Sequence, residues 1–271
     1  SLAGVFKTAK DRGANKVYGM LHGIQGLLQE RYVDLEDHIK NDLDIELLKR
    51  TPSAYLGSCR FKLPDISQDR EIYDKIFDIL NKLEIEYFFY IGGNDSMDTI
   101  KKLSDYSLLN GSNIRFMGVP KTIDNDLAAT DHTPGYGSAA KYIGSITKEV
   151  IRDGLVYDQQ NVTILEIMGR NAGWLTGAAA LAKCEDCEGP DMIFLPEVTF
   201  DVDEFMKKVA ELHKKKKSVV VAVSEGVKTA DGRYVCELTD GIDFVDAFGH
   251  KQLTGTARFL AEKINREVGC K

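Results

Sequence analysis

Five short apolar runs, each followed by a polar or glycine-containing turn, constrain the fold of this chain more than any other feature. The runs cover residues 85–91, 114–119, 162–168, 192–197 and 218–223. Their β-branched and aromatic side chains are typical of buried strands, and helical patterns follow several of the turns. This alternation predicts an α/β fold with one or two parallel sheets, in which functional residues gather along one edge.

The segment before these runs carries weaker patterns. It predicts a helix over residues 2–11, a short strand over 16–20, and helical stretches over 24–30, 35–48 and 68–83. A length of 271 residues with 43% hydrophobic and 28% charged residues is that of a soluble globular protein, and we expect two domains.

Charge and cysteine content exclude some functions and partners. A net charge of −7 argues against nucleic-acid binding, and no apolar run approaches the roughly 20 residues needed to cross a membrane. Five scattered cysteines predict a reduced, cytoplasmic protein. Cys184 and Cys187 have the spacing of a metal or redox pair, but no second pair accompanies them, and packing at a helix end is the preferred interpretation.

The turn after residues 114–119 concentrates charge in a short stretch. Pro120 ends the strand, and Lys121, Thr122, Asp124 and Asp126 follow within six residues. Because they come at the carboxyl end of a strand, they predict a site for phosphate chemistry. An ordinary turn rich in Asp and Asn is the alternative.

The turn after residues 85–91 reads Gly92-Gly93-Asn94-Asp95-Ser96, with a helix predicted over 97–103. A strand, a glycine turn and a helix start can form an anion site, because the first amides of a helix are unsatisfied. The spacing is not that of a Walker motif, and a tight turn between strand and helix is the alternative.

Two further turns complete a set of four. Residues 167–173 contain Met168, Gly169 and Arg170, and residues 224–226 contain Glu225. In order and approximate spacing the four segments resemble the phosphofructokinase family, and the resemblance runs over residues 1–271.

The resemblance implies a fold with two domains and a different ligand for each of them. We expect an α/β protein of two Rossmann-like three-layer domains with mostly parallel sheets and the active site in the cleft between them. Residues 1–133 would form the larger domain, which binds pyrophosphate and magnesium, and residues 134–271 the smaller domain, which binds fructose 6-phosphate. The chain also looks truncated at both ends, without the family's first strand and glycine loop and without its C-terminal continuation.

The resemblance further implies reversible phosphoryl transfer to fructose 6-phosphate, giving fructose 1,6-bisphosphate, in the cytoplasm and as part of glycolysis. The catalytic positions that it implies are Asp124, Lys121 and Asp126. Asp124 matches the general base, Asp126 matches a second acid near the metal and phosphates, and Lys121 supplies a cation to the phosphoryl donor. The substrate-binding positions are Thr122, Met168, Gly169, Arg170 and Glu225.

The phosphoryl donor depends on two positions. ATP-using relatives have glycine where this chain has Asp95 and Lys121, and side chains there would crowd a nucleotide. Both residues resemble the pyrophosphate-dependent subfamily, so we expect pyrophosphate to bind Gly93, Asn94, Asp95, Ser96 and Lys121. Asp95 would help to hold the cofactor Mg²⁺. Asn94 stands where many relatives have an acidic ligand, so its own role in metal binding is open.

Several alternatives stay open at this point. The chain could be an ATP-dependent phosphofructokinase, or a noncatalytic phosphate-binding fragment or regulatory subunit. A dehydrogenase is disfavoured, because no Gly-x-Gly-x-x-Gly follows a predicted strand. The family comparison also suggests a homo-oligomer, either a dimer or a tetramer.

Overall fold

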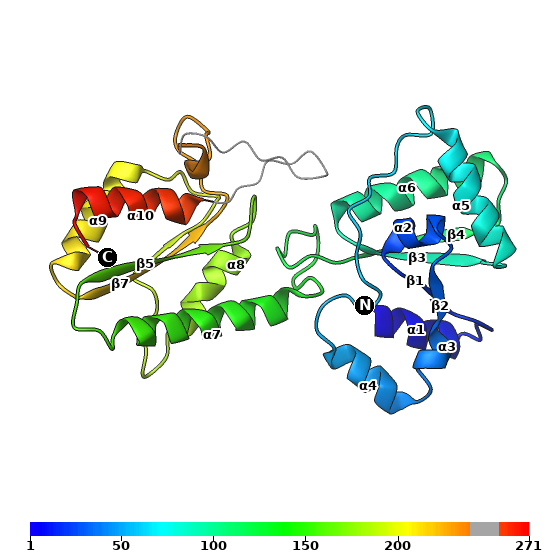
Figure 1. The fold of residues 1–271 in the computed structure, drawn as a ribbon, viewed down its shortest axis with the longest axis horizontal. Coiled ribbons are helices and arrows are strands. Elements are labelled where there is room, and N and C mark those ends of the chain that lie inside the picture. Colours follow the sequence, from blue (N-terminus) through cyan, green and yellow to red (C-terminus); the bar gives the residue numbers. More distant parts are fainter. Residues whose placement is uncertain (239–254, 271) are drawn as a thin grey trace. The chain divides into compact units, whose positions relative to one another are not determined.

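The computed structural model describes residues 1–238 and 255–270. The described chain forms two compact units (Figure 1): residues 1–121 make up the first, and residues 122–238 and 255–270 the second. In both units strands alternate with helices, and two of the three sheets are parallel. The predicted α/β fold with mostly parallel sheets is confirmed.

The first unit contains ten helices and strands. In chain order these are α1 (Leu2–Asp11), β1 (Tyr18–Met20), α2 (Gly23–Leu28), β2 (Tyr32–Asp34), α3 (Leu35–His38), α4 (Asp42–Arg50), α5 (Arg70–Lys82), β3 (Tyr87–Gly92), α6 (Asn94–Leu109) and β4 (Arg115–Pro120). Strands β3 and β4 are parallel and pair residue by residue, from Tyr87 with Arg115 to Gly92 with Pro120. Strand β1 agrees with the strand predicted over residues 16–20, whereas its antiparallel partner β2 was not predicted.

A single apolar core holds β3 and β4 to helices α5 and α6. Tyr73, Ile76 and Leu80 recur at the helical spacing along α5 and are fully or almost fully buried, as is Leu103 of α6. Phe88 of β3 lies in the same cluster. The core thereby fixes where α6 begins relative to the ends of the two strands.

The helical stretch predicted over residues 35–48 is not continuous, because two local caps divide it into α3 and α4. Asp34 accepts a hydrogen bond from the amide of Glu36 and starts α3. Asn41 and Asp44 then form a reciprocal capping box that starts α4. Asn41 has an extended backbone, so the chain turns between the two helices instead of continuing as one.

The described part of the second unit contains four α-helices and three strands. These are α7 (Tyr136–Gly154), β5 (Asn161–Ile167), α8 (Trp174–Gly177), β6 (Met192–Phe194), α9 (Val202–His213), β7 (Ser218–Ser224) and α10 (Thr256–Glu267), with 3₁₀ helices at Ala178–Ala182 (η1) and Val235–Leu238 (η2). The strands form one parallel sheet in the order β5-β7-β6. The sequence pattern also predicts a helix over residues 251–268, of which the first residues lie outside the described residues and the rest form α10.

The central strand β7 separates the two faces of this sheet. All seven of its residues are buried. Val219, Val221 and Val223 belong to the core cluster that includes α9 and α10, whereas Ala222 belongs to the cluster that includes α7 and α8. Alternation with a period of two therefore places helices on both faces, and Figure 1 shows α7 and α10 on opposite sides of the sheet. No helix in the described part of the chain is both long and apolar enough to span a bilayer.

Candidate active site

The carboxyl edge of strands β3 and β4 brings together all the predicted pyrophosphate-binding residues. Gly92 and Pro120 are the last paired residues, and the amide of Lys121 donates to the carbonyl of Gly92 at 2.8 Å. Helix α6 begins at Asn94, immediately after Gly93. The first turn of α6 and Lys121 therefore stand at the ends of two neighbouring strands.

Helix α6 starts three residues earlier than the sequence pattern predicts. Asn94, Asp95 and Ser96 form its first turn, and Gly93 precedes it without a side-chain cap. Short polar residues suit a helix N-terminus, and the carboxylate of Asp95 complements the positive end of the helix dipole. The predicted loop residues are thus the part of the helix that exposes backbone amide donors.

Small residues allow the helix to approach the strands this closely. A Cβ added to Gly92 would lie 2.0 Å from the Ser96 hydroxyl, and one added to Gly118 would lie 2.6 Å from the Met97 sulfur. Burial and the neighbouring Cys59 thiol raise the pKa of Tyr90 to about 12, and Tyr90 also shares a hydrogen bond with Ser96. Ser96 is therefore held against the end of β3.

The donor set at this edge of the first unit fits magnesium. Mg²⁺ in phosphoryl-transfer sites uses one or two carboxylates and completes its shell with substrate phosphates and water. Asp95 supplies a half-buried carboxylate at a helix N-terminus. Within residues 1–238 and 255–270 no three His, Cys, Asp or Glu side chains are gathered for a metal ion, so a protein-only metal cage is not formed there.

The loop that carries the two predicted catalytic aspartates belongs to the second unit. The Thr122 hydroxyl accepts a hydrogen bond from the Asp124 amide at 3.1 Å, and the Thr122 carbonyl accepts one from the Thr133 hydroxyl at 2.6 Å. Thr122 also forms a β-bridge with Gly135. These bonds close the loop at its base, so the backbone of Asp124 is fixed on its N-terminal side.

Asn125, between the two aspartates, fixes the backbone on the C-terminal side of Asp124. It is buried and has a left-handed backbone with φ of 59°. Its side chain donates to the carbonyl of Asp131 at 3.1 Å and accepts from the amide of Thr133 at 2.8 Å. Asn tolerates this conformation better than most residues. The reversal leaves Asp124 half-buried and Asp126 exposed.

The loops after β5 and β7 are joined by three hydrogen bonds. The Glu225 carboxylate accepts from the amide of Gly169 at 3.2 Å, and the Ser224 hydroxyl donates to the carbonyl of Gly169 at 2.7 Å. The amide of Glu225 donates to the carbonyl of Ile167 at 2.9 Å. Gly169 is therefore held on both its amide and its carbonyl.

Two glycines make this close approach possible. Gly169 has φ of 142°, and a Cβ there would lie 2.5 Å from the carbonyl oxygen of Ala172. A Cβ on Gly226 would lie 2.0 Å from the carbonyl oxygen of Arg170. The backbones of the two loops thus pass each other where only glycine fits, which locates Arg170 beside the 224–226 turn.

The electrostatics of Glu225 show which groups lie near it. Burial raises the pKa of Glu225, and the negative charges of Glu166 and Asp124 act in the same direction. The Gly169 amide and the Arg170 guanidinium oppose that change. Asp124, Arg170 and Glu225, predicted from three separate turns, therefore belong to one electrostatic neighbourhood in the second unit.

Other predicted positions are placed differently or were missed. Met168 is 57% exposed, and Asp126 is also exposed. The residues that hold the loops in place were not predicted: Gly92, Asn125, Thr133, Ser224 and Gly226. The Asp-Asn-Asp sequence signals a turn, but the sequence alone does not show which side chain is buried.

The first unit thus has an open parallel β3–β4 pair with a helix N-terminus and a lysine at its carboxyl edge, the edge at which α/β proteins commonly bind ligands. The comparison with known proteins identifies the family. The model of the phosphofructokinase family matches residues 1–271. The chain belongs to the phosphofructokinase family.

Relatives within the family differ in the phosphoryl donor that their names state. The chain is 41% identical over 271 residues to a pyrophosphate--fructose 6-phosphate 1-phosphotransferase of Xanthomonas campestris pv. campestris, with 99% of this chain and 63% of the relative covered. It is 33% identical over 270 residues to an ATP-dependent 6-phosphofructokinase of Corynebacterium efficiens, with 99% and 71% covered.

A solved structure similar to this chain carries a pyrophosphate-dependent name, as does the more similar of these two relatives. A pyrophosphate-dependent phosphofructokinase of Nitrosospira multiformis superimposes with a TM-score of 0.80 at 36% identity, covering 100% of this chain and 62% of that one. The chain therefore spans a little under two thirds of the length of these pyrophosphate-dependent relatives.

Proposed function

We propose that the complete protein transfers a phosphoryl group from pyrophosphate to fructose 6-phosphate, giving fructose 1,6-bisphosphate and phosphate. The observation that carries this proposal is the neighbourhood of Asp124, Arg170 and Glu225 at the carboxyl edge of the second unit. It supplies a carboxylate base, a cation and a hydrogen-bond acceptor, which are the groups needed to activate a sugar hydroxyl and bind a phosphorylated sugar.

The second unit would bind the sugar phosphate. Asp124 would accept the proton of the attacking hydroxyl, while Arg170 would donate to phosphoryl oxygens. Glu225 would accept hydrogen bonds from sugar hydroxyls. Thr122, Met168 and Gly169 would complete the binding surface, and Asp126 would act near the metal and the phosphates.

The first unit would bind pyrophosphate. The amides of the first turn of α6 would donate to phosphate oxygens, together with the side chains of Asn94 and Ser96 and the backbone of Gly93. Lys121 would add a cation, and Asp95 would hold Mg²⁺. The bound ion supplies charge neutralisation for the phosphoryl oxygens.

Two observations favour pyrophosphate over ATP as the donor. Asp95 and Lys121 carry side chains at the two positions where we expect glycine in ATP-using enzymes, and the structure places both residues at one sheet edge. The relative with 41% identity also carries a pyrophosphate-dependent name, whereas the ATP-dependent relative is 33% identical.

A coupled assay with fructose 6-phosphate and Mg²⁺ tests the proposal on the complete protein. We expect turnover with pyrophosphate and none with ATP. Turnover with ATP alone would overturn the choice of donor. Binding of pyrophosphate without turnover with either donor would favour a noncatalytic phosphate-binding subunit.

Variants separate the two halves of the proposal. Asp95→Gly with Lys121→Gly should weaken the use of pyrophosphate, and unchanged kinetics would remove the argument from these side chains. Asp124→Asn should lower kcat by about 10²- to 10⁴-fold, the range of general acid–base catalysis. Asp126→Asn makes the same change at the second predicted acid, and we expect a smaller loss there because Asp126 is the more exposed carboxylate.

The proposal extends to assembly and location. We place the protein in the cytoplasm, in glycolysis, as a homo-oligomer of two or four subunits. Light scattering of the complete protein tests the assembly, and a monomeric mass would contradict it.

A further inference from the structure

Cys184 and Cys187 form a tight turn between the 3₁₀ helix η1 and strand β6. The amide of Cys184 donates to the carbonyl of Cys187 at 2.9 Å, and the amide of Cys187 donates back at 3.2 Å. Residues paired in this way have Cα atoms about 5.5 Å apart, within the range of about 4.4–6.8 Å that a disulfide spans. The two backbones are therefore already placed for a bond between the sulfur atoms.

The two thiols differ in access. Cys184 is exposed, whereas Cys187 is 7% exposed. A reagent in solution therefore meets Cys184 first. Cys187 is close enough to react in a second step, because only two residues separate the pair and their backbones are bonded to each other.

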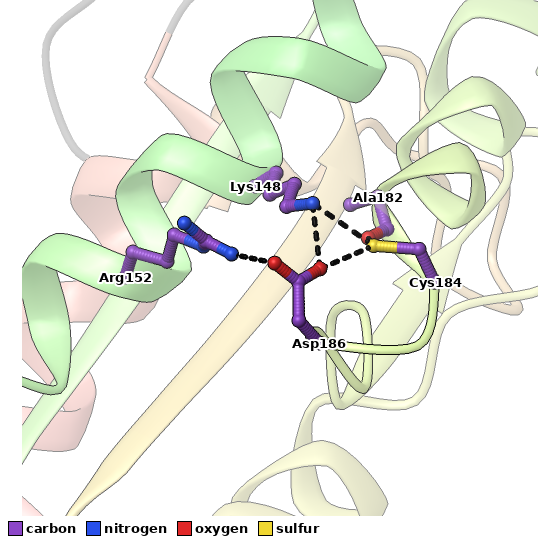
Figure 2. Close-up of polar contacts among 5 residues, drawn as sticks. All are labelled: Lys148, Arg152, Ala182, Cys184 and Asp186. Atoms are coloured by element: carbon purple, nitrogen blue, oxygen red, sulfur yellow. Dashed lines mark hydrogen bonds and ion pairs between the residues drawn. The ribbon is translucent and has the colours of Figure 1, made fainter.

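Charged groups surround the exposed thiol (Figure 2). The ammonium of Lys148 lies 3.0 Å from the Cys184 sulfur and 2.7 Å from Oδ1 of Asp186. The sulfur itself lies 3.0 Å from Oδ1 of Asp186, whose Oδ2 is bonded by Arg152. Hydrogen bonds to Asp186 and Cys184 raise the pKa of Lys148, so its ammonium stays protonated beside the sulfur. A proton donor is thus fixed next to the thiol.

We propose that Cys184 is a peroxide-sensitive thiol that oxidises and then forms a disulfide with Cys187. In the first step the Cys184 sulfur attacks one oxygen of a hydroperoxide. An S–O bond forms, the O–O bond breaks, and the released alcohol or water takes a proton that the Lys148 ammonium can supply, with the thiol proton restoring the ammonium. Sulfur loses two electrons and the peroxide gains them.

In the second step the Cys187 thiol attacks the oxidised sulfur. An S–S bond forms, the S–O bond breaks, and the hydroxyl leaves as water with the proton of Cys187. Thiol reductants reverse the change by exchange at the disulfide. Oxidation also removes the sulfur from its contact with Lys148, so the attachment of this turn to helix α7 loses one of its polar contacts.

The test compares all five cysteines of the complete protein after treatment with hydrogen peroxide. Mass spectrometry of the peptides should locate a disulfide between Cys184 and Cys187. Cys236 and Cys270 are matched internal controls, because burial raises the pKa of both thiols, and they should remain reduced. Equal oxidation of the other cysteines, or a Cys184 that stays reduced, would overturn the proposal.

Three variants examine the steps separately. Cys187→Ser should stop the reaction at a sulfenic acid on Cys184, which dimedone captures. Lys148→Gln should slow the oxidation of Cys184 about tenfold, the effect of losing about 1.4 kcal/mol in the rate-limiting step. Arg152→Gln keeps the contact between Lys148 and the sulfur and should react at the parental rate. Equal rates for Lys148→Gln and the parent would remove Lys148 from the mechanism.

Discussion

The close approach of the 168–173 and 224–226 loops leads to a quantitative prediction for Gly226→Ala. The added Cβ would lie 2.0 Å from the carbonyl oxygen of Arg170, whereas non-bonded heavy atoms in ordinary contact lie about 3.5 Å apart. The contact is with backbone, so no side-chain rotation relieves it. One of the two loops must move by about 1.5 Å, and Arg170 and Glu225 then separate from their present positions.

Two measurements follow from this displacement. Overpacking of this kind costs about 1–3 kcal/mol, so the free energy of unfolding from a urea titration should fall by that amount. Misplacement of binding groups by about 1 Å can cost about 100-fold in rate, so kcat/KM for fructose 6-phosphate in the pyrophosphate-dependent assay should fall to a similar extent.

Gly137→Ala is a matched control for the same chemical change. Gly137 lies in α7, and nothing lies within 4 Å of the position of its added Cβ. Alanine is the better helix former, so this variant should gain up to about 1 kcal/mol of stability. A Gly226→Ala protein with the parental unfolding midpoint and parental kinetics would refute the argument from loop contact.

Three further predictions concern single side chains of the second unit. Burial raises the pKa of Glu225 above its ordinary value of 4.5, so the stability linked to its protonated form is present below pH 4.5 and is lost as the pH rises through the raised pKa. Glu225→Gln should therefore have a higher free energy of unfolding than the parent at pH 7, and this difference should disappear below pH 4.5. A difference that stays constant in urea titrations across this pH range would contradict a raised pKa of Glu225. Asn125→Ala should lower the free energy of unfolding by about 2–4 kcal/mol, because two hydrogen bonds are lost and alanine does not suit the left-handed backbone. Asn125→Gly loses the same hydrogen bonds but suits that backbone, so its loss should be about 1 kcal/mol smaller. Equal urea midpoints for the two variants would show that backbone strain contributes nothing. Glu166 accepts hydrogen bonds from the amides of Gly255 and Ala257 at the start of α10, so Glu166→Gln should lower the unfolding free energy by about 1 kcal/mol, less at high salt, and a parental midpoint at low salt would exclude this capping role.

The positions that follow strands were predictable from the sequence. An apolar run followed by polar residues marks the end of a strand, and parallel pairing places such ends at one edge. On this ground Asp95 and Lys121 were each predicted to follow a strand, and the pairing of Gly92 with Pro120 shows that the ends of those two strands are neighbours. Lys121 comes directly after that last pair.

The lengths of elements and the residues that support the site were less predictable. Asn94, Asp95 and Ser96 look like a loop because they are polar, yet the same property makes them a good first turn of a helix. Asn41 interrupts an otherwise helical pattern through a capping box whose strength depends on local geometry. Gly226 matters because the backbone of Arg170, far away in the sequence, passes close to it. The sequence alone does not show that residues 170 and 226 are neighbours.

The pairing of strand β7 with β5 has a consequence for synthesis of the chain. The first residues of their register, Asn161 and Ser218, are 57 positions apart. At a translation rate of about 5–20 residues per second, β5 emerges about 3–11 s before its neighbour in the sheet. During that interval its edge and apolar face are uncovered, and nascent β5 is exposed to aggregation. The turn at Met168, Gly169 and Arg170 gains its partners from residues 224–226 only after this delay, so its geometry is completed only once β7 has been made.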